Sequence, residues 1–136
     1  MASYAIAGIE GIEESQAEAL RAAGVATAQT LLERGSDPKG RRALAEEAGI
    51  AEAQILRWVN IADLLRIHGV GKEYSDLLEA AGVDTVKELK HRNPANLTKA
   101  LAEANEKGEY VRALPTEKVV AKWIEQAKEL PPIVTY

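Results

Sequence analysis

Residues 9–27 read IEGIEESQAEALRAAGVAT, and residues 67–85 read IHGVGKEYSDLLEAAGVDT. The two stretches align without a gap, so that the chain contains an internal repeat. The aligned pairs include Gly11 with Gly69, Leu20 with Leu78, and AAGV at residues 22–25 with AAGV at residues 80–83. An internal repeat sets the architecture of a chain before any single residue is weighed. The sequence therefore predicts two copies of one small unit.

The repeat also predicts where the chain divides. The only two tryptophans, Trp58 and Trp123, fall near the ends of the two copies. We expect one repeat in residues 1–66 and a second in residues 67–136, each built on a unit of roughly 60 residues. The second copy carries a short insertion around residues 106–112 and a short C-terminal tail.

Composition limits the classes of protein that the chain can represent. It has 136 residues, of which 46% are hydrophobic, no cysteine, and a formal net charge of −4. Without cysteine there is neither a disulfide framework nor a thiolate zinc site. The first residues lack the pattern of a secretory leader, and no stretch has the length of a membrane span, so a cytoplasmic protein is expected. The negative charge argues against bulk attraction to nucleic acid or to anionic membranes.

The pattern of apolar residues is helical throughout. Tyr74, Leu77, Leu78 and Ala81 form a stripe that buries one face of a helix, and the first copy repeats it with Gln16, Ala19, Leu20 and Ala23. The spacing predicts about eight helices and an all-α fold.

Capping residues set the expected helix ends. Gly24 and Gly82 can adopt the left-handed conformation that closes a helix. The next helices begin after Thr27 and after Asp84 or Thr85, and the third after Asp37-Pro38 and Asn93-Pro94. The fourth helices, which contain the tryptophans, are predicted over residues 51–67 and 116–130, and Ile133–Tyr136 is predicted to be a tail.

One short motif has the chemistry of an anion site. His68-Gly69-Val70-Gly71 separates two predicted helices. A glycine, a hydrophobic residue and a second glycine allow a tight turn, bury the middle side chain, and point N–H groups outward at the start of the next helix. Lys72 follows and can reach a bound phosphate.

This motif resembles the helix-hairpin-helix superfamily, whose hairpins bind a nucleic-acid backbone phosphate without reading bases. The run GVGKEYSDLLEAAGVDTVKEL looks like the corresponding part of DNA-repair proteins, of topoisomerase tails and of the C-terminal domain of the RNA polymerase alpha subunit. Over nearly its full length, with DLLRIHGVG and the Asn93-Pro94 step, the chain is similar to a bacterial family of paired helix-hairpin-helix domains of unknown function. The resemblance implies tandem helix-hairpin-helix repeats, which are small SAM-like helical units.

Only one hairpin keeps the whole motif. In the first copy Glu13 replaces the second glycine, and Glu10 and Glu14 flank it, so three carboxylates would repel a phosphate. A second hairpin in each copy would be Ala48-Gly49-Ile50-Ala51 and Ala113-Leu114-Pro115, of which the first keeps one glycine and the other none.

Each candidate residue also has a purely structural interpretation. A tight joint between helices needs Gly69 and Gly71 whether or not a ligand binds. Lys87, Lys90, His91 and Arg92 form a basic strip that is either a secondary phosphate contact or a solvated helix end. His68 is either a phosphate contact or a polar cap, and both tryptophans have the pattern of core residues.

Catalysis is not expected. Two histidines and no cysteine give no nucleophile–base pair, no group of histidines and carboxylates has metal-ligand spacing, and the GxxxxGK[ST] signature is missing. We predict a chain without enzymatic activity, metal or cofactor.

Two functions remain open at this stage. In the first, the chain is a nucleic-acid-associated module that contacts a backbone phosphate, without base specificity, through Gly69, Val70, Gly71 and Lys72, with possible secondary contacts from Lys87, Lys90 and Arg92. In the second, the phosphate chemistry is lost and the chain presents an acidic helical surface to another protein. The intact second hairpin favours the first, whereas the acidic composition and the altered first hairpin favour the second.

Overall fold

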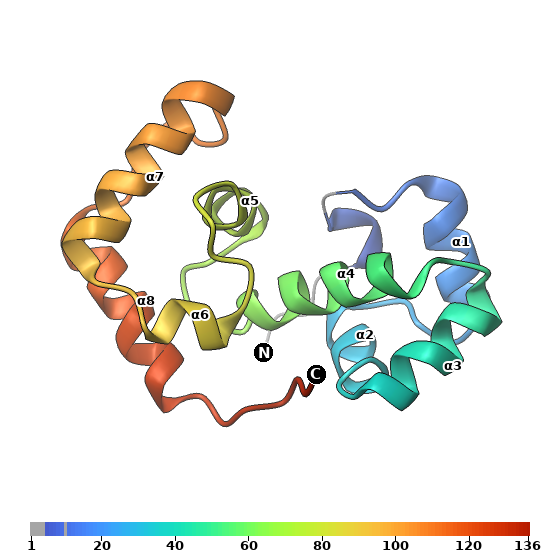
Figure 1. The fold of residues 1–136 in the computed structure, drawn as a ribbon. Helices are drawn as coiled ribbons and strands as arrows, with labels where there is room; N and C mark the ends of the chain where they lie inside the picture. Colours follow the sequence, from blue (N-terminus) through green and yellow to red (C-terminus); the bar gives the residue numbers. More distant parts are fainter. Residues whose placement is uncertain (1–4, 10) are drawn as a thin grey trace. The chain divides into compact units, whose positions relative to one another are not determined.

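A computed structural model describes residues 5–9 and 11–136, so the predicted contribution of Glu10 lies outside the described residues. The described chain is all-helical, with eight α-helices, one 3₁₀-helix and no strand (Figure 1). This confirms the predicted all-α class and the helix count. The elements are η1 (Ile6–Gly8), α1 (Glu14–Ala22), α2 (Ala28–Arg34), α3 (Pro38–Ala48), α4 (Glu52–Leu64), α5 (Lys72–Ala80), α6 (Val86–Lys90), α7 (Pro94–Gly108) and α8 (Glu117–Glu129).

The chain folds into two compact units. The first unit comprises Met1–Asp63 together with Pro132–Tyr136, and the second comprises Leu64–Pro131. The sequence division after residue 66 lies close to this boundary, but the tail that was predicted as part of the second repeat belongs to the first unit.

The helices start at the residues that the capping pattern predicts. Thr27, Thr85, Asp37 and Asn93 each accept a hydrogen bond from a backbone N–H in the first turn of the helix that follows. Side chains of this type satisfy one of the N–H groups that a helix leaves without a partner. Of the two candidates before α6, the structure selects Thr85, which accepts from the Glu88 N–H at 2.9 Å.

The helix ends of α1 and α5 are closed in the same way. Gly24 and Gly82 have φ of +89° and +94°, so both adopt the positive-φ backbone that the sequence predicts. The next residue donates its N–H back to the helix at 2.8 Å in both places, Val25 to Leu20 and Val83 to Leu78. The aligned stretches therefore form matching backbone hydrogen bonds.

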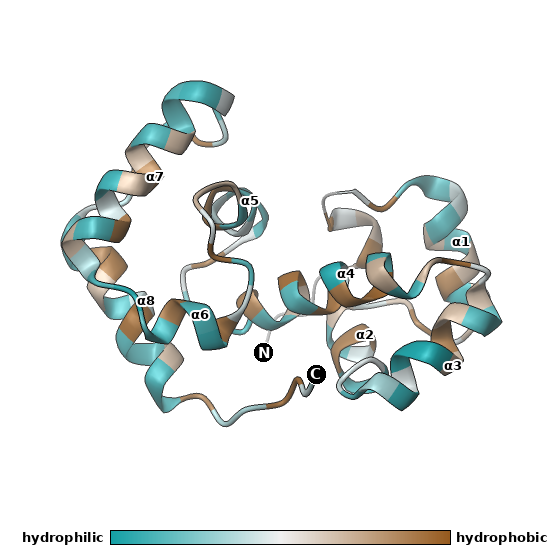
Figure 2. Cartoon of the chain, viewed as in Figure 1, coloured by the Kyte–Doolittle hydropathy of each residue, from teal (hydrophilic) through white to brown (hydrophobic). Residues whose placement is uncertain are grey.

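The second unit contains one hydrophobic core drawn from α5 to α8 and the segment before them. Its most buried members include Leu77, Leu78, Leu89, Leu101 and Trp123. Most helices carry hydrophobic residues on one side and hydrophilic residues on the other, as the amphipathic pattern requires (Figure 2). Trp123 is only 2% exposed, which confirms the prediction that it is a core residue.

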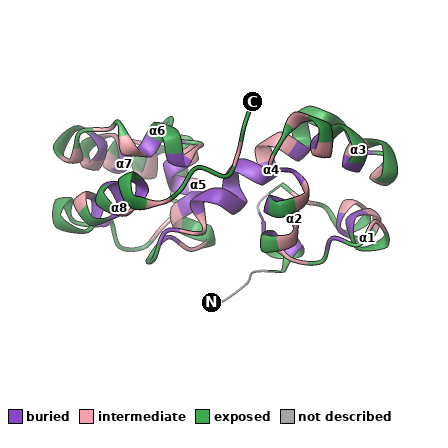
Figure 3. Cartoon of the chain, turned by 90° about the horizontal axis from the view of Figure 1, so that it is seen from below, coloured by how far each residue is buried: buried purple, intermediate pink, exposed green. Residues whose placement is uncertain are grey.

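Helix α4 contains the longest run of buried residues, 58–64, of which 58–63 belong to the first unit (Figure 3). Trp58 is 1% exposed, again as predicted. Two details of the sequence prediction were wrong. Helix α4 ends at Leu64 rather than at residue 67, and the buried face of α1 is formed by Ala17 and Leu20, whereas Gln16 caps the helix.

The C-terminal tail forms specific contacts with the first unit. The Thr135 N–H donates to the Ser36 carbonyl at 2.7 Å, and the Tyr136 hydroxyl bonds to Asn60 Oδ1 at 2.8 Å. Arg41, which is 3% exposed, donates to the carbonyls of Gly35 and Thr135. A buried guanidinium is stabilised only when its donors are satisfied, and the tail supplies one of the acceptors.

Candidate anion-binding site

The Gly69–Lys72 turn lies between the end of α4 and the start of α5. Val70 is buried in the core of the second unit, and its N–H donates to the Ile67 carbonyl at 3.0 Å. Gly69 has φ of +93°, a conformation that side-chain-bearing residues rarely adopt. Gly71 is the N-cap of α5, and Lys72 is its first residue. The four residues that the sequence selected therefore form one turn.

Helix α8 holds this turn in place through contacts with His68 and Gly69. The Gln126 side chain bonds to both backbone groups of His68: the His68 N–H donates to Oε1 at 2.8 Å, and Nε2 donates to the His68 carbonyl at 3.1 Å. A Cβ added to Gly69 would lie 3.2 Å from Trp123 Nε1. The turn is thus held in one conformation before any ligand arrives, and Gly69 has a steric role in addition to any binding role.

The first turn of α5 has no side-chain cap. The first N–H groups of a helix have no partner within the helix, and Gly71 offers no side chain to accept from them. The N-terminus of a helix also carries a partial positive charge, so these N–H groups favour an anion. Lys72 is exposed and adds a full positive charge at the same end.

The equivalent turn of the first unit is capped by its own side chains. Glu13 stands where the second copy has Gly71, and it forms a capping box with Gln16. The Glu13 N–H donates to Gln16 Oε1 at 3.0 Å, and the Gln16 N–H makes the reciprocal contact with the Glu13 carboxylate. A carboxylate of the chain therefore stands at the start of α1, where the start of α5 has a glycine.

The predicted basic strip lies on and just after α6. Lys87 and Lys90 are in its last turn, and Arg92 Nη1 lies 3.8 Å from Glu88 Oε1. The helix dipole favours positive side chains at a helix C-terminus. The position of these basic residues is therefore explained without a bound ligand.

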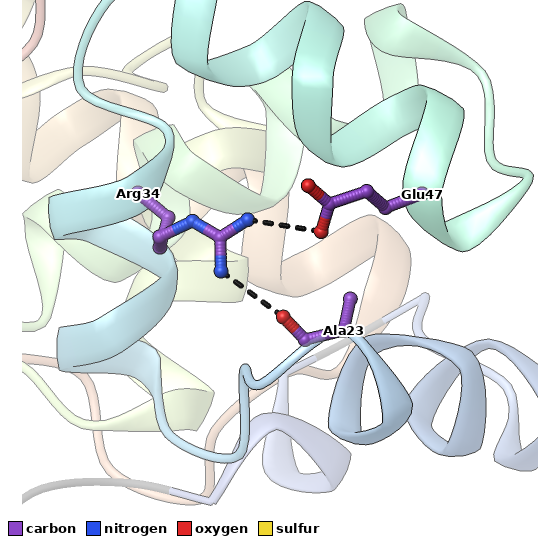
Figure 4. A network of polar contacts seen from close by, with 3 residues as sticks. All are labelled: Ala23, Arg34 and Glu47. Carbon is purple, nitrogen blue, oxygen red and sulfur yellow. Dashed lines mark hydrogen bonds and ion pairs between the residues drawn. The ribbon is translucent and has the colours of Figure 1, made fainter.

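The aligned arginine of the first unit has a structural role. Arg34 of α2 donates to the Ala23 carbonyl at the end of α1 at 3.0 Å and to Glu47 of α3 at 3.2 Å (Figure 4). Arg92 stands at the corresponding place in the second copy, where its ion pair with Glu88 is longer, at 3.8 Å. The Arg92 guanidinium thus has a longer ion pair than the Arg34 guanidinium, which bonds to two partners.

Comparison with known proteins identifies the family. A family model described as a domain of unknown function, DUF4332, matches residues 10–130. The chain belongs to the DUF4332 family. No match was found among curated proteins or solved structures.

The other two predicted hairpins of this DUF4332 domain lack the geometry of the Gly69–Lys72 turn. Gly49 is the left-handed C-cap of α3, with φ of +68°. In the segment of Ala113, Leu114 and Pro115, Leu114 is 45% exposed and Pro115 is buried. Neither segment contains a residue buried between two glycines.

Within residues 5–9 and 11–136 of the DUF4332 domain, no three histidine or carboxylate side chains are grouped so that they could hold a metal ion. None of the described helices is both long and apolar enough to cross a membrane.

Sequence reasoning missed one feature of the second unit. An open cleft lies between the first turn of α5 and the segment that follows α7. Its residues are far apart in the sequence, and the only signal was the insertion at residues 106–112, which lengthens α7 and adds the following loop.

Proposed function

We propose that this chain is a non-catalytic module that binds a nucleic-acid backbone phosphate through Gly69, Val70, Gly71 and Lys72. The observation that carries the proposal is the contrast between the two copies. At the start of α1 the chain supplies its own carboxylate, whereas the start of α5 has a glycine cap followed by a lysine. The resemblance to helix-hairpin-helix proteins supports the same assignment.

The fixed backbone of the turn supports phosphate as the ligand. A phosphate oxygen accepts hydrogen bonds from several N–H groups at once, and binding costs little when those groups are already oriented. The Gln126 bonds and the packing of Gly69 against Trp123 provide that orientation.

Contacts to phosphate position a protein on nucleic acid but carry no sequence information. The expected binding is therefore weak and not base-specific, and the net charge of −4 limits any additional general attraction. Lys87, Lys90 and Arg92 are the proposed secondary contacts. A cytoplasmic location remains part of the proposal.

The experiment is a fluorescence anisotropy titration of labelled duplex, single-stranded and hairpin nucleic acids at about 50 mM and about 150 mM salt. Four proteins are compared: wild type, Gly71→Glu, Lys72→Ala and the control Lys118→Ala. Lys118 is exposed and lies at the opposite end of α8 from Gln126, so the control removes the same charge away from the turn.

We expect Gly71→Glu to abolish binding, because it places a carboxylate where the phosphate would lie. Lys72→Ala should weaken binding equally for every sequence and lower the slope against salt by about one, whereas Lys118→Ala should bind as wild type does. Circular dichroism checks that Gly71→Glu is folded. If wild type has no measurable affinity for any nucleic acid at about 50 mM salt, the proposal fails and the protein-interaction alternative stands.

A further inference from the structure

The open cleft of the second unit has a volume of about 1120 Å³, and Gly69, Val70, Gly71 and Lys72 are not among its lining residues. It extends from the first turn of α5 to the end of α7 and the segment after it. Its charged and aromatic lining residues are Glu73, Tyr74, Glu106, Glu109, Tyr110 and Arg112.

Hydrogen bonds fix the walls of the cleft. Asn105 bonds to both backbone groups of Val111: Nδ2 donates to the Val111 carbonyl at 3.1 Å, and the Val111 N–H donates to Oδ1 at 2.9 Å. The Tyr74 hydroxyl donates to the Ala113 carbonyl at 3.1 Å. The segment after α7 is therefore fastened to α7 at one point and to α5 at another, so the cleft is present before a ligand binds.

The charge of the cleft is negative. Three carboxylates, those of Glu73, Glu106 and Glu109, line it together with one guanidinium, that of Arg112. All four residues are exposed, and none of the ion pairs or hydrogen bonds among the described residues involves their side chains. The carboxylates are thus available to an incoming cation, and complementary charge favours a cationic ligand.

Two tyrosine rings provide the apolar part of the cleft. Tyr110 is 39% exposed and packs against Gly108, where a Cβ would collide with its ring. Tyr74 packs against Trp123, with ring centroids 5.2 Å apart, so its position is fixed by the core. Leu114, which follows the lining residue Ala113 in the sequence, is 45% exposed. Aromatic rings next to carboxylates match a planar cation better than a compact one.

We propose that this cleft binds an extended, arginine-containing segment of a partner protein. An arginine guanidinium can bond to a carboxylate with two N–H groups and stack on a tyrosine ring at the same time, which a lysine ammonium cannot. The open shape of the cleft admits a chain segment rather than enclosing a small molecule, and tyrosine and arginine are enriched at protein interfaces.

The test uses the full chain and three fluorescein-labelled peptides of equal length: an arginine–glycine repeat, a lysine–glycine repeat and a serine–glycine repeat. We expect the arginine peptide to bind most tightly, the lysine peptide more weakly, and the serine peptide not at all. Glu106→Lys should weaken binding of the arginine peptide about three- to tenfold, because it replaces an attraction by a repulsion. Glu103→Lys is the matched control, since Glu103 is an exposed carboxylate on the same helix that does not line the cleft.

Glu109→Gly removes a carboxylate from the cleft with a substitution that suits the backbone at this position. Glu109 has φ of +52°, where glycine is favoured, so the substitution removes a carboxylate from the cleft while relieving backbone strain. We expect it to weaken binding of the arginine peptide severalfold while the protein stays folded. Equal binding of the serine and arginine peptides would overturn the proposal, as would an equal loss of affinity in Glu103→Lys and Glu106→Lys.

Discussion

Gly69 and Gly82 have almost the same backbone conformation, with φ of +93° and +94°, but different surroundings. A Cβ at Gly82 would meet nothing within 4 Å, whereas one at Gly69 would lie 3.2 Å from Trp123 Nε1. The sequence predicted the need for glycine at both positions. It could not predict which of the two is also a packing contact, because that depends on α8.

This difference gives a paired prediction. Gly82→Ala should destabilise the fold by about 1–2 kcal/mol, the cost of a side chain in a left-handed conformation. Gly69→Ala should cost more, because Trp123 must also move. The free energies of unfolding in urea measure both. Equal losses of unfolding free energy in the two variants would show that the contact with Trp123 adds nothing to the cost of Gly69→Ala.

Glu109 is the one described residue other than glycine with a positive φ. Glu109→Gly should therefore raise the free energy of unfolding by up to about 1 kcal/mol, since glycine adopts this conformation without the Cβ penalty. Glu106→Gly serves as the contrast: Glu106 lies within α7, where glycine should destabilise by roughly 0.5–1 kcal/mol. A loss of stability in Glu109→Gly would contradict the assigned backbone.

The buried residues predicted from the repeat should dominate stability. Leu78 is fully buried and Trp123 is 2% exposed. Leu78→Ala should cost about 2–5 kcal/mol and Trp123→Ala about 3–5 kcal/mol, because each leaves a cavity in the core of the second unit. Chemical denaturation is the measurement, and losses below about 1 kcal/mol for both would mean that these side chains are not part of the core.

At the scale of the helices, the capping signals had the greatest predictive value. Threonine or an Asx-Pro pair marked the starts of α2, α3, α6 and α7 because capping depends only on residues close in the sequence. The end of α4 was placed too late, because Leu65 and Ile67 continue the apolar pattern, whereas the backbone at His68 is held by Gln126 of α8, far along the sequence.

Thr85 provides a direct test at this scale. Thr85→Ala should destabilise the second unit by about 1 kcal/mol, because the Glu88 N–H loses its acceptor. Thr85→Ser keeps the hydroxyl and should recover most of the loss. Thermal unfolding followed by circular dichroism measures both, and equal midpoints for alanine and serine would show that the hydroxyl does not cap α6.

At the scale of the whole chain, the repeat predicted two copies of one unit, the apolar periodicity predicted the helical class, and the motif predicted a single intact turn. The contacts of Arg41 with Thr135 and the cleft that includes Glu73 and Tyr110 were not predictable. Both join residues that are distant in the sequence and carry no local pattern. The family match and the fold are compatible with several functions, so the proposed function rests on the site at the start of α5 and not on the fold.

We propose that the second copy has a phosphate site that the first copy lacks. An NMR titration of ¹⁵N-labelled protein with a short DNA duplex at about 50 mM salt tests it residue by residue. We predict that the amide signals of Gly71, Lys72 and Glu73 shift as duplex is added, while those of the aligned Glu13, Glu14 and Ser15 do not. Equal shifts at both places, or none at residues 71–73, would contradict the account.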